Sequence, residues 1–115
     1  MNADSAAWLN IFNLVVELGD GEPAKSVELR LYAPRMTDVS TLTFGCDYQF
    51  FGLGPVRTLF GATPLQATVL ALRIATADLA TLCERCRVTD SVTGALLDGA
   101  FIRATLPPED RPQPG

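Results

Sequence analysis

Apolar and polar residues alternate along the first half of the chain, and the spacing then becomes that of a helix. In residues 41–51 one set of alternate positions is apolar and the other is nearly all polar, which predicts a half-buried β-strand. Residues 27–32 repeat this pattern, and a shorter strand is expected at residues 56–60. Residues 9–18 would also suit a helix, but their β-branched and aromatic residues and the turn signal at residues 19–23 favour a strand that forms a hairpin with the next strand.

A long helix is expected directly after these strands. The Thr63 hydroxyl group can accept a hydrogen bond from the backbone N–H of Gln66, and the Gln66 side chain can reach back to the backbone N–H of Thr63. Pro64 then occupies the first helical position, where its missing N–H costs nothing. No Gly or Pro follows before Glu84, so we expect a helix of roughly twenty residues.

Together these elements predict an α+β fold, in which one long α-helix packs on one face of an antiparallel β-sheet of four or more strands. The pattern also allows a C-terminal hairpin that pairs residues 87–92 with residues 95–104. The chain has 115 residues, of which 48% are hydrophobic and 19% charged, as is typical of one globular domain. We assign residues 1–106 to this single domain and the Pro-rich residues 107–115 to a flexible tail.

The predicted helix carries two apolar strips. At about 100° of rotation per residue, the broader strip is expected to face the sheet, with Val69 at its edge. This strip consists of Leu65, Thr68, Leu72, Ala75, Leu79, Leu82 and Cys83. The second strip lies on the opposite side and consists of Leu70, Ile74 and Ala77. We expect the second strip either to be covered by the segment around Leu96 and Phe101 or to contact a partner.

The net charge and the hydropathy of the chain indicate which class of partner and which cellular location to expect. A formal net charge of −4 argues against nonspecific binding to nucleic acid, which depends on Lys and Arg near phosphates, and would favour a basic partner. Arg73 and Asp78 lie within the helix and favour a buried helix over one in a membrane. No Lys or Arg precedes the first apolar run, which argues against a signal peptide, so we expect a cytoplasmic protein.

The candidate chemical groups argue against an enzyme. The chain contains no histidine, which removes the commonest general base and most catalytic zinc sites. Cys83 and Cys86 form a C-x-x-C at the end of the helix, where the helix dipole does not lower a thiol pKa, and we interpret Cys83 and Cys46 as structural thiols. Asp47 is expected to be solvated on the polar face of its strand. We therefore expect no catalytic residue, no metal and no cofactor.

Residues 61–74 and the preceding Tyr48-Gln49-Phe50-Phe51-Gly52-Leu53-Gly54 resemble small bacterial proteins of an uncharacterised domain family. Its members carry an "I-x-G-L" type turn, a short strand and then "G-x-D-S-x-Q-A-L-x-L-A-L" at the start of a helix. The resemblance covers about residues 43–79. Thr63 stands where the family usually has Asp, and Thr68 replaces a usual Leu. The resemblance implies this fold and a likeness to immunity proteins that neutralise bacterial toxins.

The leading hypothesis is therefore a non-enzymatic protein-binding module of the immunity-protein kind. Two surfaces are the predicted partner-binding sites: Asp47 and Gln49 on the sheet, and Leu70, Arg73 and Ile74 on the helix. One alternative is a small-ligand-binding or regulatory domain with a pocket between helix and sheet. Another is a structural homodimer that uses Leu70 and Ile74.

Overall fold

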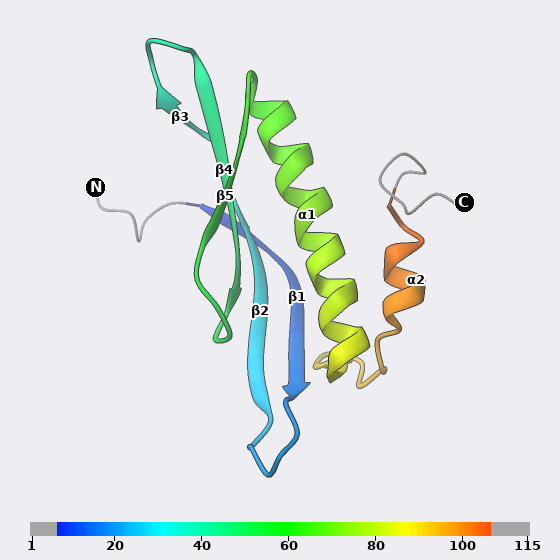
Figure 1. Cartoon of the computed structure of the whole chain (residues 1–115). Helices are drawn as coiled ribbons and strands as arrows, with labels where there is room; N and C mark the ends of the chain where they lie inside the picture. Colours follow the sequence, from blue (N-terminus) through cyan, green and yellow to red (C-terminus); the bar gives the residue numbers. More distant parts are fainter. Residues whose placement is uncertain (1–6, 107–115) are drawn as a thin grey trace.

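A computed structural model describes residues 7–106 of the chain. It contains β1 (Trp8–Glu17), β2 (Lys25–Tyr32), β3 (Arg35–Asp38), β4 (Thr43–Phe51), β5 (Arg57–Gly61), α1 (Pro64–Arg85), β6 (Arg87–Asp90) and α2 (Gly99–Arg103). The predicted antiparallel sheet with one long helix is confirmed, and residues 8–17 form a strand (Figure 1). The structure adds β3 and α2, which were not expected. The predicted tail, residues 107–115, lies outside the described residues.

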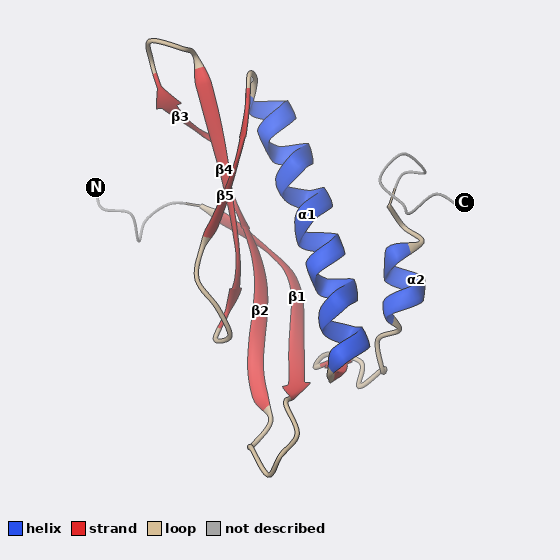
Figure 2. Ribbon diagram, in the orientation of Figure 1, coloured by secondary structure: helices blue, strands red, loops and turns tan. Residues whose placement is uncertain are grey.

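The six strands form one sheet in which every pair is antiparallel. β4 lies between β2 and β5, because Tyr48 pairs with both Leu31 and Arg57. β3 continues along the same edge of β4 as β2, since Phe44 pairs with both Met36 and Gly61. On the other side of β2 follow β1 and then β6. Both helices lie on one side of this sheet (Figure 2).

The start of α1 follows the predicted capping pattern with one correction. The Thr63 hydroxyl oxygen accepts a hydrogen bond of 3.0 Å from the backbone N–H of Gln66, and Pro64 begins the helix. The Gln66 side chain, however, accepts its hydrogen bond of 2.6 Å from the N–H of Ala62 and not from that of Thr63. Two backbone donors are still satisfied, as the capping box requires.

The face that α1 turns to the core agrees with the prediction only in part: Ala75 and Leu79 are buried and Leu82 and Cys83 pack against the core, as expected. The fully buried residues of α1 are Ala67, Ala71, Ala75, Leu79 and Ala80. Leu65 and Leu72, which were expected to face the sheet, are 72% and 43% exposed. The start of α1 packs closely on β5, because a Cβ atom on Gly61 would lie only 2.7 Å from the backbone nitrogen of Ala67. Large side chains of the sheet fill the layer beneath these alanines.

The second predicted strip of α1 is not a separate surface. Leu70, Ile74 and Ala77 are all half-buried, and Ile74 packs against the core. Of the two expected covers of this strip, the segment around Leu96 and Phe101 does pack on α1, because α2 contacts that helix. The side chains of Leu96 and Phe101 themselves are 58% and 71% exposed.

The predicted C-terminal hairpin is wrong over most of its second strand. β6 pairs with β1, but only Leu96 returns to bridge Thr89. Asp98 then accepts a hydrogen bond of 3.0 Å from the N–H of Ala100 and caps α2. α2 packs on α1 through Gly99, where an added Cβ atom would lie 2.7 Å from the carbonyl oxygen of Ala80. A helix is favoured here because Asp98 satisfies a free backbone donor.

By length and composition alone, α1 could cross a membrane, with a mean hydropathy of 1.3. The core helix of a soluble protein passes the same test.

Candidate functional site

The face of the sheet opposite α1, here called the open face, is not covered by any element of residues 7–106 (Figure 2). The register brings residues from three strands into rows across this face. Asn10 pairs with Arg30, which pairs with Gln49 on its other side. In the next row Asn13 pairs with Glu28, and Glu28 pairs with Phe51. Directly paired residues point to the same face of a sheet, so these side chains form one surface.

A stack of two aromatic rings and a guanidinium group is the central feature of the open face. The Cζ atom of Arg30 lies 3.7 Å from the ring centroid of Phe51 and 4.6 Å from that of Trp8. The Arg30 side chain is only 15% exposed, whereas Trp8 and Phe51 are 44% and 45% exposed. The Tyr32 ring lies 6.1 Å from that of Trp8. Cation–π attraction thus holds two half-exposed rings against a guanidinium group that is largely shielded from water.

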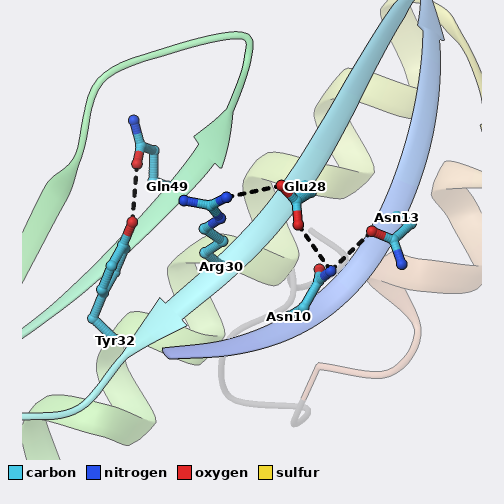
Figure 3. Close-up of polar contacts among 6 residues, drawn as sticks. All are labelled: Asn10, Asn13, Glu28, Arg30, Tyr32 and Gln49. Carbon is cyan, nitrogen blue, oxygen red and sulfur yellow. Dashed lines mark hydrogen bonds and ion pairs between the residues drawn. The ribbon is translucent and has the colours of Figure 1, made fainter. Parts of the chain in front are cut away.

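Hydrogen bonds hold the polar groups around this stack (Figure 3). Arg30 donates to Glu28 at 2.8 Å, and Asn10 donates to Glu28 at 3.1 Å and to Asn13 at 2.8 Å. The pKa of Arg30 is raised above its ordinary value, mainly by its interaction with the side chain of Tyr32 and further by Glu28. The guanidinium group therefore stays charged. The network therefore keeps the orientation of Arg30 fixed.

Gln49 and Asp47 lie on the open face, where the strand alternation predicted them. Gln49 accepts a hydrogen bond of 3.2 Å from the Tyr32 hydroxyl group and donates one of 3.1 Å to the carbonyl oxygen of Gly54. Asp47 was expected to be solvated, but its side chain is only 20% exposed and accepts a hydrogen bond of 2.6 Å from Thr58. It also forms an ion pair of 3.3 Å with Arg35.

The predicted helix residues are not part of this site. Leu70, Arg73 and Ile74 lie on α1, which packs on the opposite side of the sheet (Figure 1). Leu70 and Arg73 are half-buried, and Ile74 contacts the core. The structure therefore brings Asp47 and Gln49 together and leaves the three helix residues apart from them.

The sequence prediction missed Trp8, Arg30 and Phe51. Phe51 occupies a polar-side position in its strand, together with Asp47 and Gln49. A large aromatic residue at such a position was the one signal that could have indicated an exposed anchor. The contact with Trp8 depends on the register between β1 and β2; the turn signal at residues 19–23 predicts that these strands pair, which the structure confirms, but it does not specify the register.

The thiols and carboxylates of the described residues were the other candidates for a chemical site. Burial is the main cause that raises the pKa of the Cys46 and Cys83 thiols, which makes both less nucleophilic near neutral pH. Within residues 7–106 no group of three or more His, Cys, Asp or Glu side chains could hold a metal ion.

Two hollows flank α1 and open at the surface. One, of about 260 Å³, is apolar and lies where the start of β1 and the end of β2 approach Thr68. The other, of about 380 Å³, lies between α1 and the end of the described chain, and its lining includes Val69, Leu72 and Leu106. The ligand hypothesis placed a pocket along Leu65, Leu72 and Leu79, but Leu79 is buried in the core and the two other leucines are exposed.

No protein-family model, curated protein or solved structure matches the chain. The likeness to immunity proteins therefore stays a prediction from the sequence.

Proposed function

We propose that the protein is a non-enzymatic binding module that holds a protein partner on the open face of its sheet. The observation that carries this proposal is the stack of Trp8, Arg30 and Phe51. Trp, Tyr and Arg contribute much of the binding energy at protein interfaces. Phe is also enriched there. Here they lie together on a face that no described element covers.

The rigidity of this stack supports a role in binding. A side chain that is ordered only on binding costs about 0.5–1.5 kcal/mol of entropy. Trp8 and Phe51 are already ordered, because both contact the guanidinium group that Glu28 holds. They can therefore contact a partner with little further loss of freedom.

The charges of the open face are compatible with burial under a partner. Glu28 pairs with Arg30, and Asp47 pairs with Arg35. An unpaired charge would be costly to bury. Each of these two carboxylates already has an arginine of the same chain as its ion-pair partner. The net charge of −4 on the whole chain would speed its encounter with a basic partner.

For the partner we propose a bacterial toxin, the class that the sequence resemblance implies. The protein would bind in the cytoplasm and block the active site of the toxin or a surface beside it. This function requires no catalytic residue and no cofactor. The chain lacks histidine, which is consistent with inhibition by binding alone.

The test is co-expression with a toxin encoded by a neighbouring reading frame. The proposal expects the two proteins to co-purify and the cells to survive. A toxin that neither binds this protein nor loses its toxicity would refute the immunity function.

The open face is tested with a matched pair of phenylalanine variants. Phe51→Ala should weaken the complex by about tenfold or more, because it removes an aromatic anchor. Phe101→Ala is the control, since Phe101 is 71% exposed but lies on α2, on the other side of the sheet. Equal affinities of the two variants would show that the partner binds elsewhere.

A further inference from the structure

The apolar hollow at the start of β1 adjoins the aromatic stack of the open face. It has a volume of about 260 Å³ and lies where the start of β1 and the end of β2 approach Thr68 of α1. Trp8, a member of the stack, lines this hollow together with Tyr32, and the two rings lie 6.1 Å apart. The stack and the hollow are therefore parts of one continuous surface that share Trp8.

The polar groups that line this hollow bond within the protein. The N–H of Ala33 donates to the carbonyl oxygen of Ala7 at 3.0 Å, and the Thr68 hydroxyl group donates to the carbonyl oxygen of Pro64 at 2.8 Å. Among the described residues that line the hollow, none is charged. Water there would find few bonding partners, so an apolar group that replaces it gains free energy.

Large apolar side chains surround the hollow and face water. Leu9 pairs with the buried Leu31 and so points to the same face, yet it is 64% exposed, and both leucines line the hollow. Leu65 and Leu72, three residues before and four after Thr68, lie on the same side of α1 and are 72% and 43% exposed. Exposed apolar side chains that gather in this way indicate a contact with another protein.

The size of the hollow favours a side chain over a small ligand. An apolar cavity of about 150 Å³ already holds one benzene ring, so a hollow of about 260 Å³ has room for a Leu, Met or Phe side chain. Sites for small ligands measure about 300–1,000 Å³ and contain several polar groups that point at the ligand. This hollow is smaller, and the polar groups described above bond within the protein.

We propose that the partner held on the open face inserts one large apolar side chain, a Leu, Met or Phe, into this hollow. The inference rests on the proposed function, because the same partner covers Trp8. A charged side chain is excluded, since it would lose its hydration and find no partner in the hollow. An apolar group in a pocket at the side of an aromatic stack is the arrangement that contributes most to affinity at protein interfaces.

Two matched threonine variants test the hollow in the complex with the toxin found by co-expression. Thr68 and Thr76 are both half-buried on α1, and each hydroxyl group bonds to the carbonyl oxygen four residues earlier. Thr68→Phe fills the hollow and should weaken the complex by about tenfold or more. Thr76→Phe places the same ring at the other hollow and should leave the affinity unchanged. Circular dichroism checks that both variants are folded.

Leu9→Ser tests the wall of the hollow at an exposed position where a polar residue is tolerated. It should weaken the complex by about threefold or more, because it removes an apolar contact. Leu42→Ser is the control, since Leu42 is 60% exposed but lies in the turn between β3 and β4. Equal affinities of these two variants would overturn the inference.

An alanine scan of the toxin identifies the inserted side chain. One Leu, Met or Phe of the toxin should lose about tenfold in affinity for the natural chain when it is changed to Ala. The same change should cost at most about twofold with Thr68→Phe, because the hollow is already filled there. If every toxin variant loses the same factor with both chains, no side chain enters the hollow.

Benzene tests the hollow without the toxin. The methyl signals of Leu9 and Leu31 in nuclear magnetic resonance spectra should shift as benzene is added, and Thr68→Phe should abolish the shift. Absence of this shift, or a small metabolite that co-purifies in the hollow, would overturn the inference.

Phe51→Ala separates this inference from the proposed function. If Phe51→Ala weakens the complex and a folded Thr68→Phe does not, the partner binds the open face without using the hollow, and only the inference fails. If neither variant weakens the complex, the proposed binding face is wrong as well.

Discussion

The hydroxyl group of Tyr48 donates a hydrogen bond to the carboxylate of Asp78 and so links the middle of β4 to α1. Tyr48 is only 1% exposed, and it is the largest fully buried side chain of the core. Arg57 of β5 also contacts Asp78, at 2.9 Å. One carboxylate on the helix thus fixes its position over two neighbouring strands.

Tyr48→Phe should lower the free energy of unfolding by about 1–2 kcal/mol, because the ring still packs but the bond to a charged acceptor is lost. Urea unfolding measures this change. Tyr32→Phe is the control, since its hydroxyl group bonds to the neutral Gln49 on the half-exposed face. The loss should be clearly smaller there; equal losses would mean that the Asp78 contact adds nothing special.

Alkaline pH should destabilise the protein through the same residue. Burial, and then the bond to Asp78, raises the pKa of Tyr48 above its ordinary value. The unfolded chain therefore loses this proton more readily than the folded chain. The contribution of Tyr48 to stability is complete below a pH of about 10 and falls as the pH rises above that value. Urea unfolding at several alkaline pH values should show this slope, and Tyr48→Phe should remove it.

Gly99→Ala should destabilise the contact between the two helices. The new Cβ atom would lie 2.7 Å from both the carbonyl oxygen of Ala80 and the Cγ atom of Glu84, so α2 must shift. We expect a loss of about 1–3 kcal/mol in thermal or urea unfolding. Gly54→Ala is the control, because nothing lies within 4 Å of the Cβ position there. A neutral Gly99→Ala would mean that α2 does not need its close contact with α1.

Leu42→Asn should stabilise the protein. Leu42 has a φ of 53°, a left-handed conformation that is costly for Leu but tolerated by Asn, and its side chain is 60% exposed. Relief of this strain should raise the free energy of unfolding by about 0.5–1 kcal/mol. Val39→Asn changes a nearby exposed residue whose φ is not positive, and should not stabilise. An increase in both variants would point to a surface effect and not to strain.

Most of the strands and the extent of α1 could be predicted, because these elements leave a local signal in the sequence. The half-buried β4 alternates in polarity, and Thr63 and Pro64 mark where α1 begins. β3 and α2 gave no such signal: all four residues of β3 are exposed, and α2 has only five residues, little more than one helical turn.

The face of α1 that is buried could not be predicted, because close packing against the sheet restricts the size of its side chains as well as their hydropathy. Leucine outranks alanine on any hydropathy scale, so Leu65 and Leu72 were expected inside. The close approach of β5 to the start of α1 leaves no room for a side chain at Gly61, and the residues buried on this part of the helix are the small Ala67 and Ala71. This restriction becomes visible only when the two elements are packed together.

The candidate site was predictable only in part. Alternation along β4 placed Asp47 and Gln49 on the polar face, and they lie there. The stack of Trp8, Arg30 and Phe51 joins β1, β2 and β4, and its members lie up to 43 positions apart in the chain. Such a contact depends on strand order and register, which a single sequence does not specify.

Trp8 is the only tryptophan in the chain, and it lies within the proposed binding surface. Its indole ring is half-exposed and contacts a guanidinium group, so a partner that covers it changes its surroundings. The emission of the unmodified protein therefore reports directly on this surface. A fluorescence titration can follow binding there without a label, while a partner that binds to α2 leaves the signal almost unchanged.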